Sequence, residues 1–91
     1  MRLDVWLHKV CLVKSRSQAK QGCHSGKILL EGAPVKESHA LRVGETLSIQ
    51  HSHRELILRV LALPEGNLSK KEAPACYEVL AERPLEGAEP L

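Results

Sequence analysis

The spacing of apolar residues changes at Gly26, and this change constrains the fold more than any other feature of the chain. Before Gly26, apolar residues recur at the period of a helix with one buried face. After it they alternate with polar residues, which is the period of a strand with one buried face. The 91 residues are enough for one domain, or two at most. We therefore expect an α+β fold in which helices precede a sheet.

Two helices are predicted before Gly26. The first, in residues 3–12, carries an apolar stripe at positions i, i+3, i+4 and i+7. The second begins after Ser15, an N-cap residue that forms a capping-box pattern with Gln18. It ends at Gly26, which suits the left-handed position after a helix. A link at residues 13–14 joins the two into a helical hairpin. The stripe of the first helix consists of Leu3, Trp6, Leu7 and Val10.

Four strands are predicted after Gly26. A turn at Glu31 and Gly32 separates the first two, and Pro34 confines the second to an edge of the sheet. The polar residues 51–54 form a hairpin loop between the last two strands, of which the fourth is the longest. The expected architecture is a helical hairpin packed on a small, mainly antiparallel sheet of about four strands, followed by a short C-terminal helix. The strands span residues 28–30, 33–37, 46–50 and 55–63.

The C-terminal helix is predicted from two signals. Ser69 and Glu72 form a second capping-box pattern, and apolar residues follow at helical spacing. We accordingly divide the chain into residues 1–63, which hold the hairpin and the sheet, and a helical extension, residues 64–83. Residues 84–91 are expected to form a disordered acidic tail. The apolar positions of the extension are Ala73, Cys76, Tyr77 and Leu80.

Few residues of the chain are aromatic or contain a thiol. Trp6 and Tyr77 are the only aromatic residues, so the core must rest on Leu, Val and Ile, with Trp6 expected inside it. The three cysteines do not make a disulfide framework, and we expect them to be small buried side chains in a reducing compartment. They are Cys11, Cys23 and Cys76.

Motifs of enzymes and of cofactor sites are missing from the sequence. It has no nucleophile elbow, P-loop or dinucleotide-binding glycine motif, and no His or Cys pairs stand at the spacing of a zinc site. No stretch resembles a secretory signal or a transmembrane span. We expect a cytoplasmic protein that is not an enzyme, needs no metal or cofactor and does not engage a membrane.

Positive charge is concentrated in the first half of the chain. Residues 1–44 contain eight Lys or Arg against three Asp or Glu, which gives a net charge of +5. Residues 45–91 contain five against eight, which gives −3. The overall charge of +2 therefore hides a basic half and an acidic half, and the basic half is the candidate for contact with a polyanion.

The second predicted helix carries the sharpest charge pattern. Arg16, Lys20 and His24 stand four residues apart on one face, and like charges at this spacing destabilise an isolated helix by roughly a few tenths of a kcal/mol. No acidic residue occurs in residues 5–30. A helix selected only for stability would normally have acidic residues between its basic ones. We therefore favour the interpretation that this face binds phosphates over the alternative that it is only exposed to solvent.

The ends of the predicted helices offer further phosphate ligands. Residues 15–17 lie at a helix N-terminus, where free N–H groups favour anions, and Lys14 and Arg16 flank that end. Arg2 begins the neighbouring helix, and Lys27 lies where the second helix gives way to the first strand. Such a surface would hold a structured RNA mainly by shape and backbone. The scarcity of aromatic residues argues against a single-strand binder that stacks bases.

Four motifs, in order and at matching distances, make residues 2–50 resemble the RNA-binding domain named after small-subunit ribosomal protein S4. They are R-L-D-x-W-L, K-S-R-S-x-A-K, G-K-I-L-L-x-G and V-G-E-x-L-x-I. The resemblance implies a helical hairpin on a small sheet, whose RNA surface is called the alpha-L motif. The chain is similar in size to two stand-alone groups of this family, the heat-shock protein fifteen group and the ribosome-associated quality-control protein P group. Its C-terminal segment is more similar to the second.

The resemblance implies a set of RNA-contacting residues. Asp4 also matches the family and is expected to orient Arg2 or Arg16, with Ser15 and Gly26 as supporting residues. The chain departs from the family by lacking a basic residue at Val5 and Cys11, by Glu31 in the turn and by Glu37, which implies weaker binding to bare RNA. The matching RNA-contacting positions are Arg2, Lys14, Arg16, Ser17, Lys20 and Lys27, with Lys36 as a seventh candidate.

The resemblance also implies partners. These are rRNA of the large ribosomal subunit, the peptidyl-tRNA left on it after stalling, and a factor that adds a C-terminal tail to the nascent chain. The protein itself is expected to be a monomer. Two alternatives remain open at this point. One is a general rRNA or tRNA binder in ribosome assembly or modification, and the other is a protein-interaction module with an acidic tail and an incidental basic face.

Overall fold

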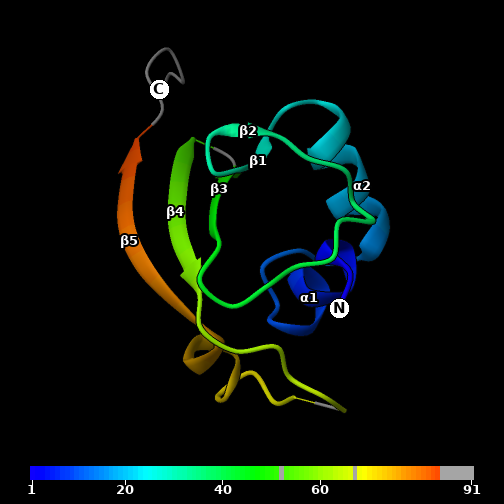
Figure 1. The fold of residues 1–91 in the computed structure, drawn as a ribbon. Helices are drawn as coiled ribbons and strands as arrows, with labels where there is room; N and C mark the ends of the chain where they lie inside the picture. Colours follow the sequence, from blue (N-terminus) through cyan, green and yellow to red (C-terminus); the bar gives the residue numbers. More distant parts are fainter. Residues whose placement is uncertain (52, 67, 85–91) are drawn as a thin grey trace.

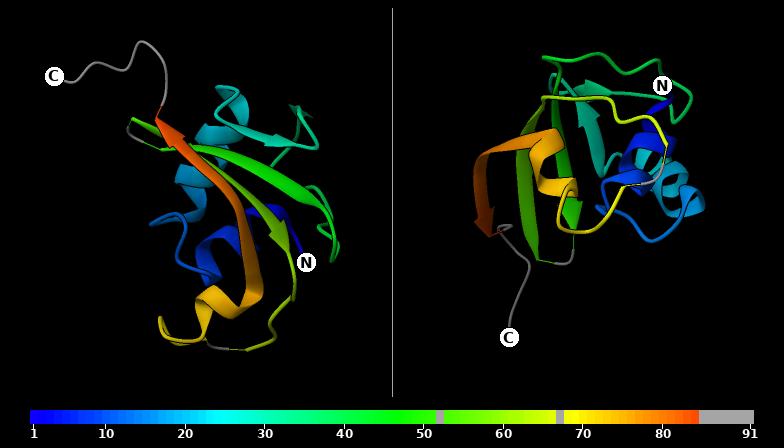
Figure 2. Two further views of the ribbon diagram at one scale, coloured as in Figure 1. Left: turned by 90° about the vertical axis from the view of Figure 1, so that its left-hand side faces the viewer. Right: turned by 90° about the horizontal axis from the view of Figure 1, so that it is seen from below.

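Two α-helices cover one face of a five-stranded antiparallel sheet in the computed structural model, which describes residues 1–51, 53–66 and 68–84 (Figures 1 and 2). The strand order is β2-β1-β3-β4-β5. The predicted α+β class, with a helical hairpin packed on an antiparallel sheet, is confirmed, with one strand more than expected. The elements are α1 (Leu3–Lys9), α2 (Arg16–His24), β1 (Ile28–Leu30), β2 (Ala33–Pro34), β3 (Thr46–His51), β4 (Arg54–Val60), the 3₁₀ helix η1 (Ala73–Cys76) and β5 (Tyr77–Pro84).

Helix α1 ends at Lys9, earlier than predicted. Cys11 takes a left-handed conformation with a φ of 64°. Its N–H donates to the His8 carbonyl at 3.1 Å, and the Leu12 N–H donates to the Leu7 carbonyl at 3.0 Å. These two bonds form the Schellman arrangement, which usually closes a helix with glycine at the left-handed position. Cys11 is therefore exposed, and the prediction that it is a buried side chain is wrong.

Both predicted ends of α2 are confirmed. The Ser15 hydroxyl accepts from the Gln18 N–H at 3.1 Å, and the Gln18 amide oxygen accepts from the Lys14 N–H at 2.6 Å. At the other end Gly26 has a φ of 77°, and the N–H of Lys27 closes a second Schellman arrangement over it. Helix α2 is thus bounded by interactions between residues close in the sequence, which is why its ends could be predicted.

The turn between β1 and β2 lies at Glu31 and Gly32, as predicted. Both residues have positive φ, 51° and 81°, which is what a two-residue type I′ hairpin turn requires. Strand β2 is an edge strand, as Pro34 requires, but it ends at Pro34 and does not continue to residue 37.

The segment after β2 leaves the sheet because it caps α1. The Glu37 carbonyl accepts from the Asp4 N–H at 3.1 Å, and the His39 carbonyl accepts from the Leu3 N–H at 2.9 Å. These N–H groups belong to the first turn of α1 and have no partner within the helix. A carbonyl used in this way is not available for the sheet, so residues 35–45 cross in front of the helices to reach β3 (Figure 1).

Strands β3 and β4 form the predicted hairpin, with Leu47 and Ile49 turned toward the helices and buried. Its predicted loop, residues 51–54, is described only in part, because Ser52 lies outside the described residues. Strand β4 ends at Val60, earlier than predicted, so it is not the longest strand.

The predicted C-terminal helix is wrong. The capping box does form, since the Glu72 N–H donates to the Ser69 hydroxyl at 3.3 Å and the Ser69 N–H donates to the Glu72 carboxylate at 3.2 Å. Only the single turn η1 follows, and Tyr77 begins β5, the longest strand. Strand β5 pairs with β4 along its whole length and satisfies backbone groups that an open edge would leave unpaired. The predicted acidic tail lies outside the described residues, except for Pro84, which ends β5.

The core lies between the two helices and the sheet. Trp6 is fully buried, as predicted, and its indole N–H donates to the Ala62 carbonyl at 2.9 Å. Its ring meets that of Tyr77 edge to face, with centroids 6.3 Å apart. Cys23 and Cys76 are buried, as predicted. The largest fully buried side chains are Trp6, Leu3, Leu7, Leu47, Leu58, Val10 and Val60. In the described part of the chain, no helix is long and apolar enough to cross a membrane.

We predict that Leu7→Ala destabilises the protein by roughly 2–5 kcal/mol, because it leaves a cavity at a fully buried position of α1. Chemical denaturation followed by the fluorescence of Trp6 measures this loss. The matched control is Leu61→Ala, at a position that is 45% exposed, where the change should stay below about 1 kcal/mol. Equal midpoints for the wild type and Leu7→Ala would show that α1 does not carry the core.

Candidate nucleic-acid interface

One buried carboxylate holds two arginines from different elements. Asp4, in the first turn of α1, is 3% exposed. Arg2 donates to both of its oxygens at 3.1 Å, and Arg16, at the start of α2, donates to one of them at 3.4 Å. The Arg2 and Arg16 side chains remain 49% and 54% exposed. Asp4 therefore orients both arginines across the helical hairpin while leaving their outer faces open to a ligand.

The Asp4 carboxyl is held in its charged form. Burial alone would raise its pKa, but the hydrogen bond from Arg2 and the positive charges of Arg16 and Arg2 outweigh burial and lower it. The carboxylate therefore stays ionised at neutral pH. The cluster of two arginines and one carboxylate carries a net positive charge, and the carboxylate is the member hidden from solvent.

The basic face of α2 has a second acidic neighbour. His24 lies 3.4 Å from the carboxylate of Glu37, whose side chain is only 19% exposed. A hydrogen bond from its own backbone N–H, and then the positive charges of His24 and Lys20, lower the pKa of Glu37 despite partial burial. Neither this contact nor its consequence was expected from the sequence, because Glu37 is distant from His24 in the chain. Acids do neutralise part of the basic face, but they come from outside α2 and lie beneath the surface.

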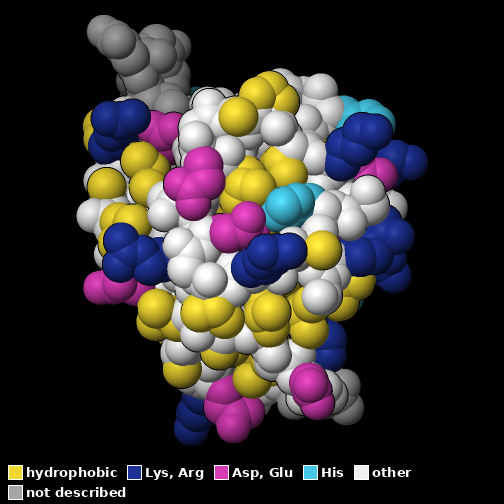
Figure 3. Space-filling model, in the orientation of Figure 1, with side chains coloured by type: hydrophobic (Ala, Val, Ile, Leu, Met, Phe, Trp, Pro, Cys, Tyr) yellow, Lys and Arg dark blue, Asp and Glu magenta, His cyan; other side chains and the backbone are white. Residues whose placement is uncertain are grey.

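Lys20 and Arg16 are exposed on the same face of α2 as His24. Figure 3 shows dark blue side chains gathered over α2 at the right of the molecule, with His beside them and little magenta between them. Five residues of the helix and its C-cap line a shallow hollow on its outer surface. They are Ser17, Lys20, Gln21, His24 and Ser25.

The remaining candidates separate into two locations. Lys14 and Lys27 lie just beyond the two ends of α2, which at nine residues is roughly 14 Å long. Lys36 lies on the segment that follows β2. All seven RNA-contacting candidates are exposed. The structure therefore joins Arg2, Arg16 and Lys20 in one cluster and leaves the other lysines at its periphery.

The exposed Arg and Lys side chains around α2 are suited to binding anions, and the other reactive groups nearby do not point to another chemistry. Burial and the carboxylates of Glu37 and Asp4 raise the pKa of Cys23 to about 11, which keeps this thiol protonated and unreactive. In residues 1–51, 53–66 and 68–84, no three His, Cys, Asp or Glu side chains gather as metal ligands would. Guanidinium and ammonium groups around a helix are donors to phosphate oxygens.

Comparisons with known proteins identify similar chains. A family model described as the S4 domain matches residues 1–47. The chain is 32% identical over 89 residues to the "RQC P-site tRNA stabilizing factor" of Halalkalibacterium halodurans, which covers 98% of this chain and 100% of that protein. It is 30% identical over 86 residues to the protein of the same name from Streptococcus pneumoniae, covering 94% and 97%. A solved structure of Vibrio cholerae Heat Shock Protein 15 superimposes with a TM-score of 0.83 at 26% identity, over 89% of this chain and 82% of that one.

We predict that Asp4→Asn lowers stability at neutral pH by about 1 kcal/mol, since hydrogen bonds to a charged group are lost but half-exposed arginines are screened by solvent. The folded-state pKa of Asp4 is lowered, so its contribution is fully present above its ordinary value of 3.8 and is lost as the pH falls through the folded value. The variant should therefore lose less stability than the wild type below about pH 4.

Chemical denaturation at a series of pH values measures this difference. Glu82→Gln is the matched control, because Glu82 pairs with Arg54 where both side chains are largely exposed. Removing this exposed ion pair should change the free energy of unfolding little. If the wild type and Asp4→Asn lost stability in parallel at acid pH, Asp4 would not be the linked group.

Proposed function

Since the chain belongs to the S4 domain family, we propose that it binds RNA of the large ribosomal subunit and stabilises P-site tRNA there after translation has stalled. Support comes first from relatives that match nearly the whole chain and are named as P-site tRNA stabilizing factors. The similarity to these relatives extends past the family model, which stops at residue 47, into the region of β4 and β5. The likeness thus covers the arrangement of the full chain as well as its RNA-binding motifs.

The observation that carries this proposal is the arginine pair on Asp4. A guanidinium has five N–H donors in a fixed plane, of which Arg2 uses two on Asp4 and Arg16 uses one. Both can still donate to a phosphate, and their orientation is already restricted by Asp4. Preorganised donors lose less conformational freedom on binding than free side chains do.

The proposed RNA surface is built around this pair. Arg2, Arg16 and Lys20 form its centre, with Ser17 on the outer face of α2. Donors placed along a rigid helix suit the regular phosphate spacing of a folded RNA, which proteins recognise mainly through shape and backbone. The peripheral members of the proposed surface are Lys14, Lys27 and Lys36, supported by Ser15 and Gly26.

We propose that this protein acts only by binding RNA and catalyses no reaction, and that it does so as a monomer in the cytoplasm. In this scheme it holds the tRNA while another factor extends the nascent chain at its C-terminus. The buried, protonated state of Cys23 and the exposed donors of α2 support a binding role over a catalytic one.

A second candidate function is general binding of rRNA or tRNA, without a role in stalled translation. The Heat Shock Protein 15 structure shares the fold of this chain, and neither its name nor that of the S4 domain specifies a tRNA in the P site. The two candidates differ in whether bound large subunits carry tRNA. The third, a protein-interaction module, differs from both in needing no RNA.

We predict that binding to purified large ribosomal subunits weakens with salt, with a log–log slope of about −4 to −5 for about five phosphate contacts. Arg16→Ala and Arg2→Ala should each weaken binding and reduce the magnitude of the slope by about 1. Co-sedimentation at several salt concentrations measures both effects.

Arg59→Ala is the matched control, because Arg59 is half exposed on β4 and pairs with Glu78 of β5, away from the helices. It should bind as the wild type does. Binding that ignores salt would point to the protein-interaction module, and unchanged binding of both arginine variants would remove them from the RNA surface.

We also predict that the tagged protein, purified from cells in which translation stalls, brings down large subunits that carry peptidyl-tRNA and a second protein. Northern blotting for tRNA and mass spectrometry of the eluate measure this. The Arg16→Ala variant serves as the control and should recover fewer such subunits. Recovery of vacant subunits or free rRNA alone would favour the general binder.

A further inference from the structure

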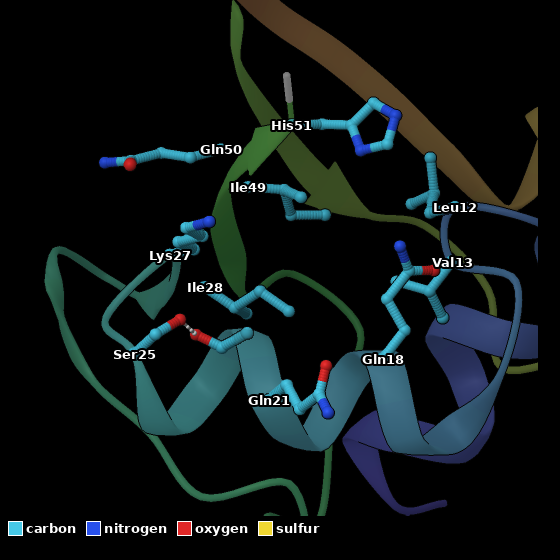
Figure 4. A pocket seen from close by; sticks show the side chains of 11 residues that line it. Leu12, Val13, Gln18, Gln21, Ser25, Lys27, Ile28, Ile49, Gln50 and His51 are labelled. Atoms are coloured by element: carbon cyan, nitrogen blue, oxygen red, sulfur yellow. Dashed lines mark hydrogen bonds between the residues drawn. The ribbon is translucent and has the colours of Figure 1, made fainter. Parts of the chain in front are cut away.

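A cavity of about 290 Å³ lies on the flank of α2 opposite the arginine cluster. It opens between α2, the link from α1 and the adjoining ends of β1 and β3 (Figure 4). In a helix of 3.6 residues per turn, Gln18 and Gln21 lie on a different side from Arg16 and Lys20. The cavity is therefore separate from the arginine cluster.

Apolar side chains form one part of the cavity lining. Val13, Ile28 and Ile49 line it and are themselves buried. Gly22 lets Ile28 lie directly against the helix, because a Cβ at this position would come within 2.6 Å of the end of the Ile28 side chain. A flat, uncharged group that entered this space would contact these side chains at the small part of their surface that is exposed.

The walls of the cavity are polar and contain no acid. Figure 4 shows the amides of Gln18 and Gln21 along the helix and the imidazole of His51 across from them, while Gln50 points away. The Gln18 oxygen accepts from Lys14 N–H, which leaves its NH₂ group as a donor. Within the described residues, the exposed Gln21 amide makes no hydrogen bond and can both donate and accept. Such amides match the mixed donors and acceptors on the edge of a nucleobase.

Positive charge lies at the rim of the cavity. Lys27 supplies this charge as one of the lining residues, and Lys14 follows the lining residue Val13 and donates its backbone N–H to the Gln18 oxygen. Gln21 and Ser25 line this cavity and also the shallow hollow on the outer surface of α2. A phosphate backbone held at the basic face could therefore cross the helix and bring its next residue to the cavity.

We propose that this cavity takes one unstacked nucleobase of the bound RNA, with Lys14 and Lys27 meeting the flanking phosphates. The proposal rests on the proposed function, since it assumes that RNA lies on α2. The base would place its ring against Ile28 and Ile49, stack on or hydrogen-bond to His51, and offer its edge to Gln18 and Gln21. This protein has few aromatic side chains on which a base could stack. In our proposal the cavity holds the base instead, as aromatic stacking platforms do in other RNA binders.

The first test uses the full chain and mononucleotides. AMP, GMP, CMP and UMP are added separately, and ribose 5-phosphate serves as a matched probe that lacks a base. In ¹⁵N-resolved NMR spectra, at least one nucleotide should shift the side-chain amides of Gln18 and Gln21 saturably, at about millimolar concentration. Ribose 5-phosphate should leave these amides unshifted. Equal shifts with all five compounds, or none, would overturn the base proposal.

The second test uses large ribosomal subunits and the variant Gln21→Ala/His51→Ala, in which two exposed side chains are removed without touching the core. Binding should become about ten-fold weaker through lost contacts to the base, while the salt slope stays that of the wild type, because no phosphate contact is lost. His53→Ala is the matched control, an exposed histidine outside the cavity lining, and should bind normally.

The outcomes separate this proposal from the function on which it rests. If the wild type binds subunits with the expected salt slope and the cavity variant binds equally well, the cavity proposal fails and the RNA-binding function stands. A reduced slope for the variant would show a lost phosphate contact and would also overturn it. If the wild type binds no RNA at all, both proposals fail together.

Discussion

The arrangement of the basic surface depends on the interactions of the Asp4 carboxylate. Its side chain bonds to Arg2 and Arg16, and its backbone N–H donates to the Glu37 carbonyl. Glu37 in turn lies against His24 at the far end of α2. Asp4 thus connects the start of α1, both ends of α2 and the segment that follows β2. Removing a carboxylate from water is costly, and here two guanidinium groups offset that cost.

The apolar core supports this polar surface from beneath. The stripe of α1 packs Trp6 and Leu7 against the sheet, which fixes the helix whose first turn presents Asp4. Ala19 and Cys23 bury the inner side of α2, so its charged side must face outward. The rigid placement of both helices lets a few exposed side chains act together. Without the sheet, like charges four residues apart would only weaken α2.

Local interactions explain which parts of the fold could be predicted. The caps of α2, the I′ turn at Glu31 and the β3–β4 hairpin involve residues close in the sequence, and all were found where expected. The end of α1 at Lys9 was missed because the left-handed residue that follows it is Cys11, and a left-handed residue other than glycine has no clear sequence signal. The C-terminal helix was predicted from a genuine capping box at Ser69, but the free edge of β4 favoured a strand instead.

The sequence by itself determined the order of elements from α1 to β4, the buried stripe of α1 and the row of Arg16, Lys20 and His24, because each follows from periodicity or from neighbouring residues. Only the tertiary structure decided that Glu37 meets His24 and that Asp4 holds Arg2 and Arg16 at the same time. Glu37 reaches His24 through the path of the chain after β2, and the cavity beside Gln21 exists only where α2 meets β1 and β3. Contacts between residues distant in the chain depend on how the helices pack on the sheet, and no local pattern encodes that packing.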